Sequence, residues 1–232
     1  AGDLDRVYTV KPEYAAVEGS SMYLKAGETL SLRDTLYGLM LASGNDAAVA
    51  IAGECGGMNA FVGKMNAKAA ELGLTDTHFD NPNGLPSDTH YTTAHELAKI
   101  TAAALKDPVF RQIVSTKSCT VSGHAMSNQN RLLSMYDGAI GVKTGFTRAA
   151  GRCLVSAAER NGRTIIAVTL NDPNDWNDHR EMLDAGFAQS ADPAEPRGEG
   201  TRPKLGGNRP SGLRRPGKKP RALMSSETQG DV

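Results

Sequence analysis

The fold is decided by the stretch Leu36-Tyr37-Gly38-Leu39-Met40-Leu41-Ala42-Ser43-Gly44-Asn45-Asp46-Ala47-Ala48. Apolar residues recur at helical spacing in its first half, and the capping box Ser31-Leu32-Arg33-Asp34 precedes them as a helix start. The pattern breaks at Ser43-Gly44, and the alanine-rich run that begins with Asp46 has the composition of a buried helix. The stretch therefore predicts two helices joined by a tight turn.

The flanking residues extend this plan. Residues 7–10 and 21–24 are predicted to be short strands around a Gly-Ser turn. A third helix is predicted over residues 59–72, with Gly73 as its stop. Its apolar face comprises Phe61, Val62, Met65 and Leu72.

The second half of the chain begins with helices and ends with strands. Residues 80–92 are rich in Asn, Pro, Gly and Ser and read as a loop, and helices are predicted over 93–105 and 107–115. The predicted strands are 118–122, 139–143, 153–159 and 163–170. The Asn161-Gly162 pair marks a tight hairpin between the last two, and a final helix is predicted over 175–187. This order implies an α+β fold, in which a helical cluster packs on an antiparallel sheet.

The composition excludes several classes of function. The 26 basic and 26 acidic residues balance, so charge gives no reason to expect a nucleic-acid partner. Three cysteines lie far apart, with no CxxC pair and no histidine at ligand spacing, so neither a zinc site nor another cofactor is predicted. No apolar run approaches the roughly 18 residues that indicate a membrane span, and the first residues do not read as a signal peptide.

The sequence divides near residue 187. Residues 1–187 are predicted to form the folded domain, while residues 188–232 hold six of the 11 prolines and few large apolar side chains. Such a segment buries too little surface to offset its chain entropy, so we predict a disordered tail. Its basic cluster, Arg214-Arg215-Pro216-Gly217-Lys218-Lys219, reads as solvated, with contact to an anionic surface as the alternative.

Two short motifs carry the chemistry. Ser43-Gly44-Asn45 lies between two predicted helices, and Lys143-Thr144-Gly145 lies at the end of a predicted strand. Each motif alone is weak, because a three-residue pattern recurs by chance and Gly-Asn after a helix is usually a C-cap. Together, in this order and in these structural contexts, they form a specific signal.

The pair resembles the Ser-x-Asn and Lys-Thr-Gly motifs of penicillin-binding proteins and serine β-lactamases. The wider match, over about residues 4–187, is to low-molecular-mass serine D-alanyl-D-alanine carboxypeptidases of peptidase family S11. It is carried by residues 17–24 and 36–48, and by Asn81-Pro82-Asn83-Gly84-Leu85, His90-Tyr91-Thr92-Thr93-Ala94 and Gly141-Val142-Lys143-Thr144-Gly145-Phe146-Thr147. The resemblance implies a β-lactamase/transpeptidase-like fold and cleavage of the terminal D-Ala-D-Ala amide of peptidoglycan stem peptides through a serine ester.

The resemblance also assigns roles to the motif residues. Ser43 is expected to relay a proton near the leaving amine, and Asn45 to hold the substrate backbone and the lysine of the family's Ser-x-x-Lys motif. Lys143 adds positive charge beside a carboxylate-bearing substrate, and Thr144 can donate a hydrogen bond to that carboxylate. Gly145 lets the substrate lie against the strand edge.

Further expectations concern binding and location. Arg180, in the last helix, is the candidate for the arginine that binds the terminal carboxylate, with a solvated helix residue as the alternative. The resemblance implies stem peptides as partners and β-lactams as inhibitors, and it implies a place outside the cytoplasmic membrane. Membrane association through a C-terminal helix is not supported by residues 188–232.

One departure from the family pattern matters for activity. No Ser-x-x-Lys occurs in the 232 residues: Ser21 reaches Lys25, one position too far, and Ser115 reaches Lys117, one too short. The family places this nucleophile motif tens of residues before Ser-x-Asn, so we expect the domain to lack its first strands and its nucleophile helix. The chain as written is therefore expected to be inactive.

Two rival functions stay open on the sequence. One is a non-catalytic remnant that binds peptidoglycan stems or β-lactams, although intact Ser43, Asn45 and Lys143 argue against a degenerate site. The other is a β-lactamase, which must deacylate quickly. Residues 80–92 lack the Glu-x-x-Leu-Asn element with which class A enzymes position the deacylating water, so this alternative is disfavoured.

Overall fold

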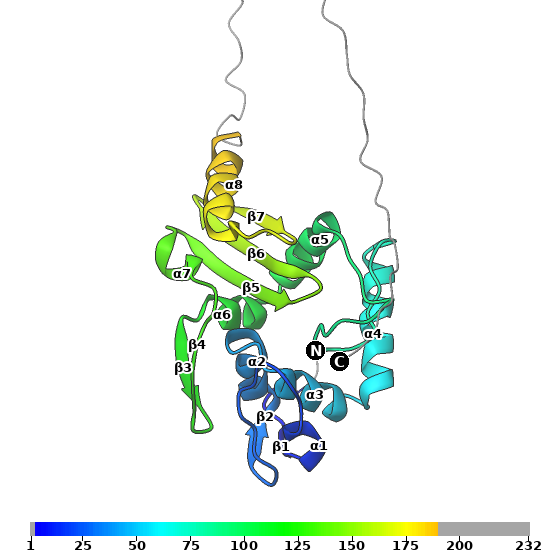
Figure 1. Ribbon diagram of the computed structural model, residues 1–232. Coiled ribbons are helices and arrows are strands. Elements are labelled where there is room, and N and C mark those ends of the chain that lie inside the picture. Colours follow the sequence, from blue (N-terminus) through cyan, green and yellow to red (C-terminus); the bar gives the residue numbers. More distant parts are fainter. Residues whose placement is uncertain (1–2, 190–232) are drawn as a thin grey trace, which may run out of the picture. The chain divides into compact units, whose positions relative to one another are not determined.

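The structure, a computed structural model, describes residues 3–189. Helices and antiparallel strands are mixed along this part of the chain, as expected for an α+β fold (Figure 1). Within it, no helix is both long and apolar enough to cross a membrane. The predicted tail, residues 188–232, lies outside the described residues except for its first two.

The N-terminal strand pairs with a different partner from the one predicted. Strand β1 (Val7–Thr9) pairs antiparallel with β2 (Thr29–Ser31), and the short helix α1 (Pro12–Ala15) follows β1. The predicted strand over residues 21–24 is wrong, because this segment forms a loop. Backbone amides of this segment donate to the side-chain carboxylate of Asp46 instead of to a neighbouring strand, and Tyr23 adopts φ 66°.

Two helices form the centre of the first half. Helix α2 (Leu32–Leu41) starts where the capping box predicts, with Ser31 Oγ accepting from the backbone amide of Asp34 at 3.0 Å. Helix α3 (Asn45–Glu54) follows after the predicted tight turn. Leu30 of β2, Leu41 of α2 and Ala50 of α3 lie in one buried cluster with the apolar side chains around them.

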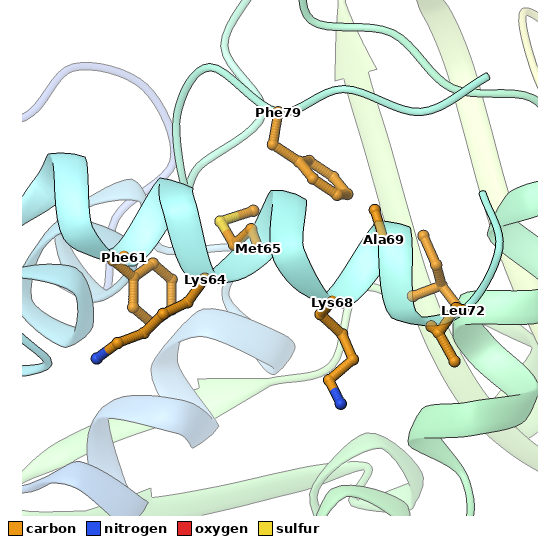
Figure 2. A pocket seen from close by; sticks show the side chains of 8 residues that line it. Phe61, Lys64, Met65, Lys68, Ala69, Leu72 and Phe79 are labelled. Carbon is orange, nitrogen blue, oxygen red and sulfur yellow. The ribbon is translucent and has the colours of Figure 1, made fainter. Parts of the chain in front are cut away.

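Helix α4 (Met58–Glu71) confirms the third predicted helix, and Gly73 follows its end with φ 69°. Of its residues only Ala69 is buried. Phe61, Met65 and Leu72 instead line an open groove of about 340 Å³ together with Phe79 and Ile100 (Figure 2). The apolar face of α4 is thus only partly covered within the described chain.

The middle of the chain follows the prediction closely. Helix α5 (Ala94–Ala104) is capped by the Thr93 hydroxyl, and α6 (Pro108–Ser115) by the Asp107 carboxylate. The loop before α5 is closed by an isolated bridge between His78 and Tyr91. The predicted strand β3 (Ser118–Val121) forms a hairpin with β4 (His124–Ser127), which was not predicted. The short helix α7 (Leu132–Met135) was not predicted either.

The main sheet has three antiparallel strands in the order β5 (Ala139–Thr147), β6 (Gly151–Arg160) and β7 (Arg163–Thr169). The predicted Asn-Gly hairpin is confirmed, since Asn161 and Gly162 both have positive φ, as a type I′ turn requires. Strand β5 is longer than predicted and continues four residues past Lys143, so the Lys-Thr-Gly motif lies within the strand.

Both faces of this sheet are covered. Alternate residues of β6 point to opposite faces: Leu154 packs with Leu183 of α8 (Asp175–Gln189), whereas Ala157 packs with Val114 of α6. Helix α5 also contacts β7 (Figure 1). The sheet therefore presents strand β5 as an edge beside the helices of the first half.

A buried histidine predicts how stability depends on pH. His179 is 0% exposed and bonds to the hydroxyls of Ser156 and Thr169, and burial lowers its pKa from 6.5 to about 4. Between these values the unfolded chain binds a proton that the folded chain does not. Stability is therefore full above about pH 6.5 and falls toward pH 4, by up to about 3 kcal/mol from this group.

Urea unfolding at about pH 7.5 and pH 4.5 measures this loss, with His179→Gln as the control that cannot titrate. The wild-type protein should lose more free energy of unfolding over this interval than the variant does. Equal losses in the two proteins would contradict the assignment.

Candidate active site

The turn between α2 and α3 holds Ser43 in an unusual backbone conformation. Ser43 has φ 57°, a left-handed value that is uncommon for a residue with a Cβ. The next residue must be glycine, because a Cβ on Gly44 would lie 2.7 Å from Asp46 Oδ1 and 3.1 Å from the Met22 nitrogen. The close approach of these groups fixes the turn and the direction of the Ser43 side chain.

Lys143 of β5 reaches this turn across 100 positions of sequence. Its Nζ donates to Ser43 Oγ at 2.7 Å and to the carbonyl of Thr144 at 2.7 Å. Strand β5 is held there by close packing on α6, since a Cβ on Gly141 would lie 2.8 Å from the Val114 carbonyl oxygen. The fold thus brings together the first residues of the two predicted motifs.

The electrostatic setting of Lys143 favours loss of its proton. Burial lowers the pKa of the ammonium group from 10.5 to about 8. No carboxylate of residues 3–189 forms an ion pair with it. A lysine in this state can exchange protons with a neighbouring hydroxyl near neutral pH.

Asn45 lies at the start of α3 and is 8% exposed. Its Nδ2 donates to the carbonyl of Glu18 at 2.7 Å, and its backbone amide donates to the carbonyl of Ser20 at 2.8 Å. The side chain is therefore oriented by the loop that precedes β2. It shares a turn with Ser43 but makes no described hydrogen bond to Lys143.

Thr144 is connected to the same turn through a glutamine that the sequence did not single out. Thr144 Oγ1 donates to Gln129 Oε1 at 3.3 Å, and Gln129 Nε2 donates to the carbonyl of Ala42 at 3.1 Å. Gly145 and Phe146 follow on β5 and are exposed. Gln129 stands in no motif and its role depends on a loop that crosses between α2 and β5, so no local signal could have indicated it.

Comparison with known proteins identifies the family of the chain. A family model for D-alanyl-D-alanine carboxypeptidase, peptidase S11, matches residues 4–174. The D-alanyl-D-alanine carboxypeptidase of Streptomyces sp. strain K15 is 38% identical over 210 residues, 80% of this chain and 72% of that protein. The chain belongs to the D-alanyl-D-alanine carboxypeptidase family.

Other members of the family agree. DacB2 of Mycobacterium tuberculosis, also named a D-alanyl-D-alanine carboxypeptidase, is 40% identical over 200 residues, 80% of this chain and 69% of that protein. The crystal structure of the Streptomyces K15 DD-transpeptidase matches this chain with a TM-score of 0.75 at 38% identity, and the match covers 80% of each chain. A penicillin-binding protein homologue from Mycobacterium tuberculosis has a TM-score of 0.76 at 36% identity, covering 84% and 77%. The predicted family and fold class are thereby confirmed.

The remaining predicted site residue, Arg180, has no described bond to the two motifs. Arg180 is exposed on α8, beside the buried His179, and makes no described hydrogen bond or ion pair with Ser43, Asn45 or Lys143. Its assignment to the substrate carboxylate stays a prediction. Within residues 3–189 no group of three or more His, Cys, Asp and Glu side chains could hold a metal ion.

The Ser43–Lys143 contact predicts how the lysine titrates. Lys143 should titrate near pH 8 instead of 10.5 in the folded protein. Ser43→Ala should move its pKa lower still, because the site stays buried while the charged form loses one hydrogen-bond acceptor. NMR of the protein labelled with ¹³C in its lysine side chains, followed over a pH titration, measures both values. A Lys143 pKa close to that of the exposed lysines would contradict the prediction.

Proposed function

We propose that this chain supplies the substrate-binding and proton-transfer part of a serine D-Ala-D-Ala carboxypeptidase site, acting on peptidoglycan stem peptides. The observation that carries the proposal is the 2.7 Å contact between Lys143 Nζ and Ser43 Oγ. It joins the two family motifs into one unit, with a lysine whose pKa of about 8 suits proton exchange. Membership of the family and the names of its relatives support the reaction class.

In this proposal each motif residue has a separate task. Lys143 attracts the terminal carboxylate of the peptide, and Thr144 donates a hydrogen bond to it from the same strand. Ser43, bonded to Lys143, passes a proton toward the nitrogen of the leaving D-alanine. Asn45, oriented by the Glu18 carbonyl, holds the peptide backbone.

The edge of the main sheet at strand β5 supports binding of the peptide along that strand. Strand β5 has one neighbour, β6, so within the described chain its other edge is unpaired. An extended stem peptide can add to such an edge through backbone hydrogen bonds. Gly145 is exposed on this strand and presents no side chain against the bound peptide. The substrate is part of the cell wall, which favours an extracytoplasmic location.

The nucleophile is the missing part of this mechanism. The 232 residues contain no Ser-x-x-Lys, and the Ser43 hydroxyl oxygen accepts a hydrogen bond from Lys143. We therefore propose that these residues bind stem peptides but do not themselves form the serine ester. The alternative of a non-catalytic binding protein predicts the same behaviour and differs only in whether a Ser-x-x-Lys segment is encoded upstream of residue 1.

The proposal predicts no acylation of this polypeptide. After incubation with benzylpenicillin, intact mass spectrometry should show the unmodified chain, and D-alanine should not be released from a diacyl-Lys-D-Ala-D-Ala peptide. Circular dichroism and a cooperative urea transition must first establish that the sample is folded. A penicilloyl adduct on any serine, located by peptide mapping, would contradict the absence of a nucleophile.

The binding half of the proposal has its own prediction. A peptide ending in D-Ala-D-Ala should shift the NMR signals of Lys143, whereas the same peptide ending in L-Ala-L-Ala should not. Thr144→Val is expected to weaken binding by about 10-fold or more, since a hydrogen bond to a charged group contributes about 1.5–3 kcal/mol. Equal shifts with both peptides would refute specific recognition of the D-Ala-D-Ala end.

A further inference from the structure

A buried carboxylate next to the Ser43 turn is not part of the proposed chemistry. Asp46 is 1% exposed and has no basic partner among the described ion pairs. Its Oδ2 accepts from Ser21 Oγ at 2.6 Å and from the Leu24 amide at 3.0 Å. Its Oδ1 accepts from the amides of Met22 at 3.1 Å and Ala47 at 2.9 Å. All four acceptor positions of the carboxylate are therefore occupied.

These contacts fix a loop that would otherwise have no regular structure. Residues 21–24 pair with no strand, and Tyr23 has φ 66°. Asp46 takes the amide hydrogens that a neighbouring strand would bind, so the loop follows the shape of one side chain. The Met22 carbonyl is also bonded, by His124 Nδ1 at 2.9 Å.

The same loop bonds to Asn45 and lies beside Gly44, the residue that follows Ser43. The carbonyls of Glu18 and Ser20, just before the clamped residues, bind the side-chain and backbone nitrogens of Asn45. Gly44 lies directly against Asp46 Oδ1 and the Met22 nitrogen, with no room for a Cβ. A shift of the carboxylate or of Met22 therefore changes what surrounds Gly44, the residue that follows Ser43.

We infer that Asp46 is a positioning residue, which sets the geometry of Ser43 and Asn45 through the loop of residues 18–24. The inference rests on the proposed function of the Ser43–Lys143 site. Only a carboxylate fits the position, because donors approach both of its oxygens. An asparagine must turn an NH₂ group toward backbone N–H groups, which cannot accept a hydrogen bond.

An ordinary structural role must be distinguished from this one. A carboxylate in the first turn of a helix is stabilised by the helix dipole, so any change at Asp46 is expected to lower stability. Glu54 offers a matched comparison at the other end of α3. Its carboxylate is mostly buried and accepts from Arg6 Nη1 and the Tyr14 hydroxyl, both at 3.0 Å, but it bonds to neither residues 18–24 nor the Ser43 turn.

The experiment compares Asp46→Asn with Glu54→Gln in the full chain. Thermal unfolding reports stability, and NMR of ¹³C-labelled lysine reports the pKa of Lys143. Both variants should lower Tm. Only Asp46→Asn should lower the Lys143 pKa further below about 8, by about one unit, because a displaced Ser43 hydroxyl no longer accepts a hydrogen bond from the charged ammonium group. An unchanged Lys143 pKa in folded Asp46→Asn, or an equal fall in Glu54→Gln, overturns the inference.

A milder variant keeps the test decisive if Asp46→Asn does not fold. Ser21→Ala leaves the carboxylate intact but removes the hydroxyl that donates to it and that accepts from the Tyr23 amide at 2.7 Å. A smaller fall of the Lys143 pKa is expected, and no fall in the folded variant overturns the inference. These readouts need no substrate, so a failure to bind D-Ala-D-Ala peptides would refute the proposed function separately.

Discussion

The carboxylate of Asp46 accepts hydrogen bonds from two segments at once, and the shape of the Ser43 turn follows from that constraint. The loop of residues 21–24 wraps one side of it, and the first turn of α3 closes the other. A buried charge without a cation is tolerated only when hydrogen bonds replace its lost hydration. Here the hydrogen bonds come mostly from backbone amides. Stabilising the buried carboxylate therefore requires the chain to follow one path around it.

A second constraint joins this turn to the sheet. Gly141 brings β5 against the backbone of α6, and two residues later Lys143 meets Ser43. Gln129 connects the same two elements by bonding to Thr144 on one side and to the Ala42 carbonyl on the other. The site therefore lies where a helix turn, a sheet edge and a crossing loop are each fixed by close backbone packing.

Local chemistry explains which parts of the fold the sequence could predict. The Ser31 cap, the Asp107 cap and the Asn161-Gly162 turn satisfy their hydrogen bonds within a few residues, and all three form as expected. Residues 21–24 have the apolar alternation of a strand, but the group that takes their amide hydrogens is Asp46, more than 20 positions away. Patterning cannot reveal a competitor at that distance, and the strand prediction failed for this reason.

The same distinction applies to the site. Ser43, Asn45 and Lys143 were found from motifs, and the contact between Ser43 and Lys143 agrees with that pairing. Gln129 and Asp46 act through tertiary contacts and carry no motif of their own. The described contacts that orient the motif residues are made by residues 18–47 and 114–144. The geometry of the motif residues therefore depends on tertiary contacts between segments far apart in the sequence, which no local pattern encodes.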